Sequence, residues 1–380
     1  WKWKDKIDRK FMALYSDFEP MDVEEPHIAS AVLGENKKID VMRCSGCAAK
    51  VGGNVLSKVM ARVRTDYPHL IPPVGADDAA IIEIPGAGNL VQSVDFFRSF
   101  IRDPYLFGQI AANHCLNDLF AMGVKPHSAL AIVALEPASN GRQEETLYAQ
   151  LAGALDVFRP LTVQLAGGHT AEYSEPGLGF TVNGFVEPDA LMRKTGLHVS
   201  DELILTKPLG TGVIMAGQMR LMTKGRWIEA AVDGMLKSNH AASLIFQQSG
   251  VTACTDVTGF GLVGHILEMT QGNSELSVEI NINELPELDG VTELLKEDIV
   301  SSLSAANGLA MDQMDTSKCR VTDRLPILFD PQTAGGLLAA VSHDRAQDVV
   351  SQLHKAGYDK ACSIGTVVAR GASDKTIYVI

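Results

Sequence analysis

Two short apolar segments follow one another directly in the first third of the chain, and they constrain the fold more than any other feature. A-A-I-I-E-I at 79–84 and L-V-Q-S-V-D-F-F at 90–97 both have the composition of strands, and no helix-length segment separates them. Strands and long helical segments alternate from there on, but such neighbouring strands recur too often for a purely doubly wound sheet. The sequence therefore predicts an α+β fold.

The expected elements fall into two units. For the first unit, the sequence predicts helices within 51–69, 103–122 and 144–158, and strands over 128–135, 162–166 and 178–186. For the second unit, it predicts strands near 202–205, 251–256 and 277–282 and helices around 227–248 and up to Met269. We place the junction near 190–200. The expected segments are a linker or remnant tail of an upstream domain (1–39), a mobile glycine-flanked Cys/Lys segment with a helix (40–72) and two α+β domains (73–195 and 196–380).

Charge and composition narrow the class of protein. The 380 residues carry a formal net charge of −13, which disfavours binding to nucleic-acid phosphates because that needs clustered Lys and Arg. The longest uninterrupted apolar stretch, Ala129 to Leu135, is far shorter than the roughly 20 residues that cross a bilayer. Six cysteines without a repeated spacing favour a reducing compartment over a disulfide framework. We therefore expect a cytoplasmic protein with neither nucleic-acid nor membrane partners.

The segment R-C-S-G-C-A-A-K-V-G-G at 43–53 places a possible nucleophile beside a fixed cation. Lys50 follows Cys47 by three residues, and an ammonium group lowers the pKa of a nearby thiol below about 8.5, which favours the reactive thiolate. The same Lys50 can meet a phosphate as a point charge. Cys44 and Cys47 also read as a C-x-x-C redox pair or as half of a zinc site, but the remaining cysteines are scattered singly and supply no second half.

Aspartates beside small or apolar residues form the next chemistry-bearing pattern, and they are Asp77, Asp78, Asp95, Asp118 and Asp256. Carboxylates in apolar sequence are costly unless they are paired or bind a metal. Mg²⁺ suits such groups, because it takes one or two carboxylates together with the phosphate oxygens of a substrate. Any one of these aspartates is as readily explained as a helix cap or turn residue as it is as a metal ligand. The whole set, beside glycine-rich turns, favours a site for a magnesium nucleotide.

Two glycine-rich segments are candidate phosphate cradles, although the P-loop pattern G-x-x-x-x-G-K-[ST] does not occur. Residues 259–264 match G-x-G-x-x-G after an expected strand. Because no run of parallel βαβ units surrounds them, we predict a turn leading into a helix rather than a dinucleotide site. Gly167, Gly168, His169 and Thr170 form the second candidate, because adjacent glycines let backbone N–H groups come close to a phosphate.

The order of these motifs resembles one family of enzymes. The C-x-x-K loop, D-D-A-A, V-D-F-F, N-D-L-F-A-M-G, A-G-G-H-T, K-P-L-G-T-G, T-D-V-T-G-F-G-L-V-G-H and D-P-Q-T-A-G-G-L together are similar to the selenide, water dikinase (selenophosphate synthetase) family over about residues 40–380. Several are shared with the wider group of aminoimidazole ribonucleotide synthetase-like (PurM-like) ATP enzymes, which includes thiamine-monophosphate kinase and a hydrogenase maturation factor. The Cys/Lys loop and T-D-V-T-G-F-G-L-V-G-H point to the selenide branch.

The resemblance implies that selenide, ATP and water react to selenophosphate, AMP and phosphate in a homodimer of two-domain α+β subunits, whose N-terminal domains form a shared sheet or barrel. It implies catalytic roles for Cys47, which would handle selenium, and for Lys50, which would contact nucleotide phosphates. Asp78, Asp118 and Asp256 would bind Mg²⁺, with more than one ion per ATP. The implied ATP-binding residues are Lys50, Gly75, Ala76, Asp77, Asp95, Asp118, Gly167, Gly168 and His169.

The chain departs from the family pattern at one position. Many members carry a second Cys two residues after the catalytic one, where this chain has Ala49, so a requirement for that thiol does not hold here. Cys44 is either a substitute resolving thiol or an incidental loop residue. The N-terminal W-K-W-K-D-K-I-D-R-K-F-M is similar to the C-terminal tail of pyridine-nucleotide-disulfide oxidoreductases, which predicts that this chain is the C-terminal part of a fusion.

Two other functions stay open on the sequence. One is an ATP-dependent kinase of the same superfamily that acts on a small molecule such as thiamine monophosphate, and it would release ADP rather than AMP. The Cys/Lys loop argues against this kinase. The other is a nonenzymatic ATP-binding regulator, against which Lys50, Asp78, Asp118 and Asp256 argue together.

Overall fold

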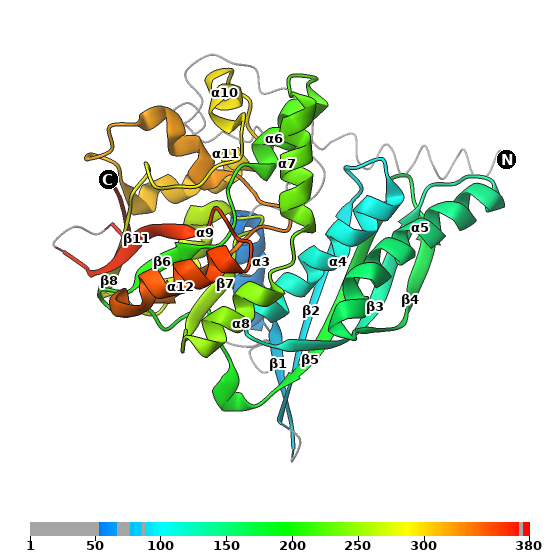
Figure 1. Ribbon diagram of the computed structural model, residues 1–380, viewed down its shortest axis with the longest axis horizontal. Helices are drawn as coiled ribbons and strands as arrows, with labels where there is room; N and C mark the ends of the chain where they lie inside the picture. Colours follow the sequence, from blue (N-terminus) through cyan, green and yellow to red (C-terminus); the bar gives the residue numbers. More distant parts are fainter. Residues whose placement is uncertain (1–52, 67–76, 86–87, 372–374) are drawn as a thin grey trace. The chain divides into compact units, whose positions relative to one another are not determined.

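The computed structural model describes residues 53–66, 77–85, 88–371 and 375–380 (Figure 1). Contacts divide the chain into residues 1–38 and 39–380, and every described residue lies in the second unit. Cys44, Cys47, Lys50, Gly75 and Ala76 lie outside the described residues, as does the N-terminal segment that resembles an oxidoreductase tail. In the described ranges, no helix combines the length and the apolar character that crossing a membrane requires.

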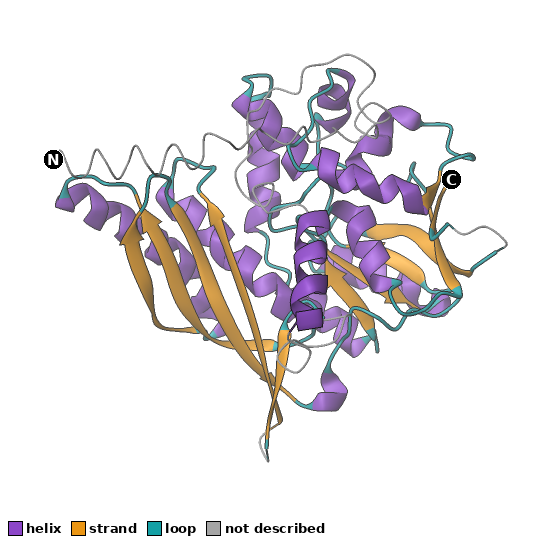
Figure 2. Cartoon of the chain, turned by 180° about the vertical axis from the view of Figure 1, so that it is seen from behind, coloured by secondary structure: helices purple, strands orange, loops and turns teal. Residues whose placement is uncertain are grey.

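The first sheet is built from residues 80–186. Its strands are β1 (Ala80–Ile84), β2 (Gly88–Arg98), β3 (Lys125–Leu135), β4 (Gln164–Glu172) and β5 (Gly177–Val186), in the order β1-β2-β5-β3-β4. Neighbouring strands are antiparallel except for β3 and β4, which are parallel. Helices α4 (Pro104–Ala121) and α5 (Asn140–Phe158) cover one face, and the strands lie in front of these helices in Figure 2. A mixed sheet with helices on one side confirms the predicted α+β class.

Helix α4 begins at a local sequence signal and lies in the interior. The carboxylate of Asp103 accepts hydrogen bonds from the backbone N–H groups of Tyr105 and Leu106 at 2.9 and 3.1 Å, and Pro104 occupies the first turn, where no N–H is needed. The helix packs against β2, β5 and α5 on one side and against the second domain on the other. Nearly all of its later residues are therefore buried, as expected of an interior helix.

The second sheet has seven strands in the order β7-β10-β6-β11-β8-β12-β9. They are β6 (Glu202–Leu205), β7 (Ala253–Asp256), β8 (Leu276–Ile280), β9 (Met314–Asp315), β10 (Leu337–Val341), β11 (Cys362–Ala369) and β12 (Ile377–Val379). The helices of this half are α6 (Thr211–Met219), α7 (Gly225–Leu236), α8 (His240–Gln248), α9 (Gly261–Met269), α10 (Val291–Lys296), α11 (Ser304–Asn307) and α12 (His343–Lys355). Helix α3 (Gly53–Asp66) matches the helix expected within 51–69.

Buried polar side chains of α4 join it to the second half of the chain. The Nδ2 atom of Asn113 donates to the carbonyl of Leu236 at 2.8 Å, and the side-chain oxygen of Asn117 accepts from Nδ2 of Asn239 at 2.9 Å. These three asparagines are almost fully buried, so their hydrogen bonds replace bonds to water. The contacts fix α4 against α7 and α8, and with it the aspartate at position 118.

The strand expected over 162–166 is longer than predicted. It continues as β4 to Glu172, so the candidate cradle Gly167–Thr170 is extended backbone within a sheet. A Cβ at Gly168 would lie 2.2 Å from the carbonyl oxygen of Ala131, so glycine permits the close approach of β4 to β3. The glycines at 259–264 behave as predicted: Gly261 has φ of +70° and begins α9 after a turn from β7.

Candidate active site

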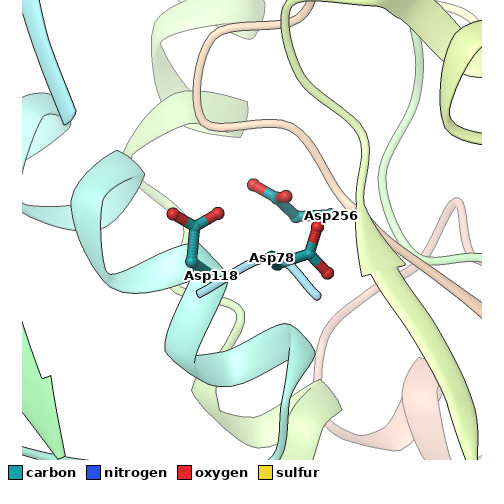
Figure 3. Close-up of side chains that lie close together, drawn as sticks. All are labelled: Asp78, Asp118 and Asp256. Atoms are coloured by element: carbon teal, nitrogen blue, oxygen red, sulfur yellow. The ribbon is translucent and has the colours of Figure 1, made fainter. Parts of the chain in front are cut away.

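Three carboxylates from separate parts of the chain point toward one another (Figure 3). Asp78 precedes β1, Asp118 lies in α4 and Asp256 is the last residue of β7. One oxygen from each lies within 4.8 Å of the others, and no other such group of His, Cys, Asp and Glu occurs among the described residues. The structure thus brings together the three aspartates that the family resemblance implied as metal ligands.

The surroundings of Asp118 disfavour its charge when no cation is present. Burial, followed by repulsion from Asp256, Asp95 and Asp78, raises the pKa of Asp118 well above its usual value. The Ser93 hydroxyl opposes this effect by donating a hydrogen bond to Oδ2 of Asp118. The carboxylate is therefore held in place by β2 but lacks a compensating positive charge among these neighbours.

The two oxygens of Asp78 have different surroundings. Oδ1 accepts from Nζ of Lys194 at 2.8 Å and from Oγ1 of Thr255 at 2.9 Å. Oδ2 is buried and has no hydrogen-bond partner in the described part of the chain. Burial raises the pKa of Asp78, although Lys194 works against that rise. A buried carboxylate oxygen without a partner, next to two more carboxylates, is a position where a cation would be favourable.

The donor set fits Mg²⁺. All three side chains offer hard, anionic oxygens, and the group contains neither a thiolate nor an imidazole. Mg²⁺ binds carboxylates of this kind while keeping coordination positions for water and for the phosphate oxygens of a nucleotide. The residues present therefore suit a magnesium nucleotide better than a zinc or copper ion.

Two further predicted residues lie close to these aspartates. Asp77 is bound by Nη1 of Arg193 at 2.6 Å and by the backbone N–H of Lys194 at 3.0 Å. Asp95 lies on β2, where its Oδ2 is 3.5 Å from Nε2 of His114 and its charge acts on Asp118. Asp77 and Asp95 thus add two carboxylates next to the three-aspartate group.

The remaining described candidates lie elsewhere. Gly167, Gly168 and His169 are exposed on the edge strand β4, which is three strands away from β2 in the sheet. At a strand spacing of about 4.8 Å, this places them about 14 Å from β2 across the sheet. One copy of the chain does not bring them next to the three aspartates.

Sequence reasoning missed Ser93, Thr255 and Lys194. Ser93 and Thr255 stand close to Asp95 and Asp256 in the chain, so their sequence neighbourhood offered a signal. Lys194 lies in the segment between the two sheets, and nothing in its surroundings marks it as a partner for Asp78. Only the fold shows this contact, because the two residues are far apart in the sequence.

Comparison with known families divides the chain into two matched regions. Residues 76–186 match the family described as AIR synthase related protein, N-terminal domain, and residues 199–377 match the corresponding C-terminal domain. A selenide, water dikinase from Clostridioides difficile is 34% identical over 351 residues, which cover 90% of this chain and 99% of the relative. One from Pelobacter propionicus is 36% identical over 330 residues, which cover 85% and 93%.

Solved structures with the same architecture include two other kinds of protein. Thiamine monophosphate kinase from Aquifex aeolicus aligns with a TM-score of 0.61 at 16% identity, covering 85% of this chain and 96% of its own. The hydrogenase maturation protein HypE in complex with ATP aligns with a TM-score of 0.56 at 18% identity, covering 82% and 87%. These likenesses confirm the predicted two-domain, PurM-like fold.

Proposed function

Since this chain belongs to the selenide, water dikinase family, we propose that it is the enzyme that converts selenide, ATP and water to selenophosphate, AMP and phosphate. The observation that carries the proposal is the convergence of Asp78, Asp118 and Asp256 in a chain that matches such dikinases over most of its length. The fold alone fits other phosphoryl-transfer enzymes equally well, so the sequence identity decides the substrate.

In this proposal, Asp78, Asp118 and Asp256 hold Mg²⁺, with more than one ion per ATP. Bound Mg²⁺ would neutralise the phosphates of ATP and stabilise the charge on the transferring phosphoryl group. Asp77 and Asp95 would position the nucleotide beside these ligands, and the partly buried Ser93 would keep Asp118 in its place.

The remaining proposed catalytic residues belong to the Cys/Lys segment at 43–53, and they lie outside the described residues. Cys47 would act on selenium as a soft nucleophile, and Lys50 would contact the phosphates of ATP together with Gly75 and Ala76. Closure of a glycine-flanked segment over the aspartates would exclude water from the first transfer. The chain's cytoplasmic location, its division at 39, 72 and 195, and its origin from a fusion stay predictions.

Apolar side chains on the first sheet support a homodimer. Val94, Phe96, Leu130 and Phe185 are 59, 41, 42 and 49% exposed. Val94 and Leu130 both pair with Thr181 from opposite sides, so they share the face that α4 and α5 leave open among the described residues. An apolar sheet face suits a second copy of the same sheet. Such a dimer would also allow Gly167 to His169 of one copy to serve a nucleotide on the other.

We expect a charge on this face to break the dimer. Val94→Glu combined with Phe96→Glu should produce a monomer in analytical ultracentrifugation, because four carboxylates would be buried against one another in the pair of subunits. Tyr148→Glu is the matched control, since Tyr148 is 71% exposed on α5, on the other side of the sheet. A wild-type protein that is already monomeric at micromolar concentration would contradict the dimer.

Anaerobic ³¹P NMR of the wild-type chain tests the reaction itself. With Mg-ATP and selenide, we expect a new phosphorus resonance coupled to selenium, together with AMP and phosphate. Formation of ADP alone, independent of selenide, would favour the small-molecule kinase, whose fold this chain shares. Persistence of ATP under all conditions would favour a nonenzymatic ATP-binding regulator.

A further inference from the structure

We propose that the partly buried Lys194 is a positioning residue, which turns one oxygen of Asp78 toward the metal site by binding the other oxygen. The inference rests on the proposed function, in which Asp78 is a ligand of Mg²⁺. The first observation that supports it is that the two oxygens of Asp78 differ in their contacts. Oδ1 is bound by Nζ of Lys194 and by Thr255, whereas Oδ2 is buried and has no partner in the described residues. Partners behind a ligand commonly fix its orientation in this way.

Lys194 is itself held from its far side. Its Nζ lies 3.1 Å from Oε2 of Glu268 on α9, and Nδ1 of His265, one turn earlier, lies 3.3 Å from the same oxygen. The other ring nitrogen of His265, Nε2, accepts the backbone N–H of Thr258 at 3.0 Å. Because Nε2 accepts this bond, Nδ1 is the ring nitrogen that carries a proton, and it faces Glu268 at a distance without hydrogen-bond geometry.

The chain of contacts from Lys194 through Glu268 to His265 ends next to Asp256, a second proposed ligand. Thr258 stands two residues after Asp256, in the turn between β7 and α9. Thr255, which also binds Asp78, stands one residue before Asp256. Two routes therefore tie the position of Asp78 to the loop that carries Asp256, one through Thr255 and one through Lys194.

The backbone of Lys194 is fixed as well. The N–H of Arg193 donates to Thr252 at 2.8 Å, and the N–H of Cys254 donates back to Arg193 at 2.8 Å, so this segment lies along β7. The N–H of Lys194 binds Asp77 at 3.0 Å. The backbone of Lys194 is thus anchored both to β7, which carries Asp256, and to Asp77. A residue that positions Asp78 needs such a fixed backbone.

The positive charge of Lys194 is balanced by the negative charge of Glu268. Burial lowers the pKa of Lys194, but attraction to Asp78 and Glu268 outweighs burial and raises it above the usual value. Burial raises the pKa of Glu268, but its contacts with His265 and Lys194 outweigh burial and lower it. Both groups are therefore charged near neutral pH, and their charges cancel. The pair can orient Asp78 without adding net positive charge beside a bound cation.

The decisive measurement is the affinity for Mn²⁺, used as a probe for Mg²⁺, by electron paramagnetic resonance on the full chain with a nonhydrolysable ATP analogue. We expect Lys194→Met to weaken Mn²⁺ binding about 10- to 100-fold, the usual effect of removing a partner behind a ligand. If only the charge of Lys194 mattered, Lys194→Met should bind Mn²⁺ more tightly, because the variant loses a positive charge that repels the metal ion. Unchanged or tighter binding by Lys194→Met would overturn the proposal.

Three further variants keep the test sharp. Thr255→Val has nearly the same volume and charge but removes the second donor to Oδ1, so we expect weaker Mn²⁺ binding, by a smaller factor than for Lys194→Met. Lys194→Arg keeps the charge and should recover most of the affinity. Arg98→Met removes a cation from an ion pair with the exposed Glu175 and should bind Mn²⁺ like the wild type. If Lys194→Met fails to fold, wild-type affinity in Thr255→Val overturns the proposal.

Asp256→Asn separates this proposal from the proposed function. If the wild type does not bind Mn²⁺, or if Asp256→Asn binds it equally well, the three-aspartate metal site is wrong whatever Lys194 does. If Asp256→Asn loses Mn²⁺ while both Lys194→Met and Thr255→Val keep it, the metal site stands and only the positioning role fails.

Discussion

An Asp118→Asn variant is expected to lose more than about 100-fold in selenide-dependent turnover and yet to be more stable than the metal-free wild type. Removal of a proposed direct ligand should cost more than the 10- to 100-fold typical of residues behind a ligand. The wild type must bury a charged carboxylate at position 118 and hold it against repulsion from Asp256, Asp95 and Asp78. Asn carries no charge, so the variant avoids both costs and gains stability. We expect roughly 1 kcal/mol, or about 2–4 °C in Tm.

The gain should depend on pH in a defined direction. The pKa of Asp118 is higher in the folded protein than its usual value near 4. A carboxyl group of this kind contributes stability that is fully present below the unfolded pKa and is lost as pH rises through the folded pKa. The Tm of Asp118→Asn should therefore exceed that of the wild type most at neutral pH, and the difference should shrink as pH falls toward about 4 and be smallest below it.

Thermal unfolding with and without Mg-ATP measures both effects. The ligand should raise the Tm of the wild type, since it binds only the folded state, and should raise the Tm of Asp118→Asn much less. Asp359→Asn, an exposed carboxylate outside the site, is the control and should leave the Tm and turnover unchanged. An Asp118→Asn protein that is less stable than the wild type at every pH would show that the three carboxylates do not repel one another as their geometry indicates.

Local signals explain why much of the fold was predictable from the sequence. Asp103 and Pro104 mark the start of α4 through a cap and a fixed backbone angle, which involve only neighbouring residues. The strands β1 and β2 were visible as adjacent apolar segments. In these cases the structure depends on short-range chemistry, so the sequence alone was sufficient.

Contacts between distant residues explain what the sequence did not reveal. The extension of β4 through Gly168 depends on the carbonyl of Ala131 in another strand. The pairing of Lys194 with Asp78 depends on where the segment between the sheets lies along β7. Motif spacing pointed to the aspartates individually, but their 4.8 Å grouping required the packing of α4 against the second sheet.

A Cys47→Ser variant is expected to form selenophosphate at least about 1,000-fold more slowly while binding Mg-ATP within a few-fold of the wild type. A thiolate is a soft nucleophile, whereas a serine hydroxyl stays protonated near neutral pH, and loss of a nucleophile commonly costs this much or more. The aspartates proposed to hold Mg-ATP come from β7, α4 and the segment before β1, so the substitution leaves them intact.

Cys44→Ser, three residues away in the same segment, is the matched control that separates a catalytic thiol from an incidental one. If Cys47 alone acts on selenium, Cys44→Ser keeps wild-type selenide-dependent AMP formation under reducing conditions, and only Cys47→Ser loses it. An equal loss in both variants would instead favour a C-x-x-C pair whose two thiols act together. Full activity in Cys47→Ser would remove the Cys47 thiol from the proposed mechanism.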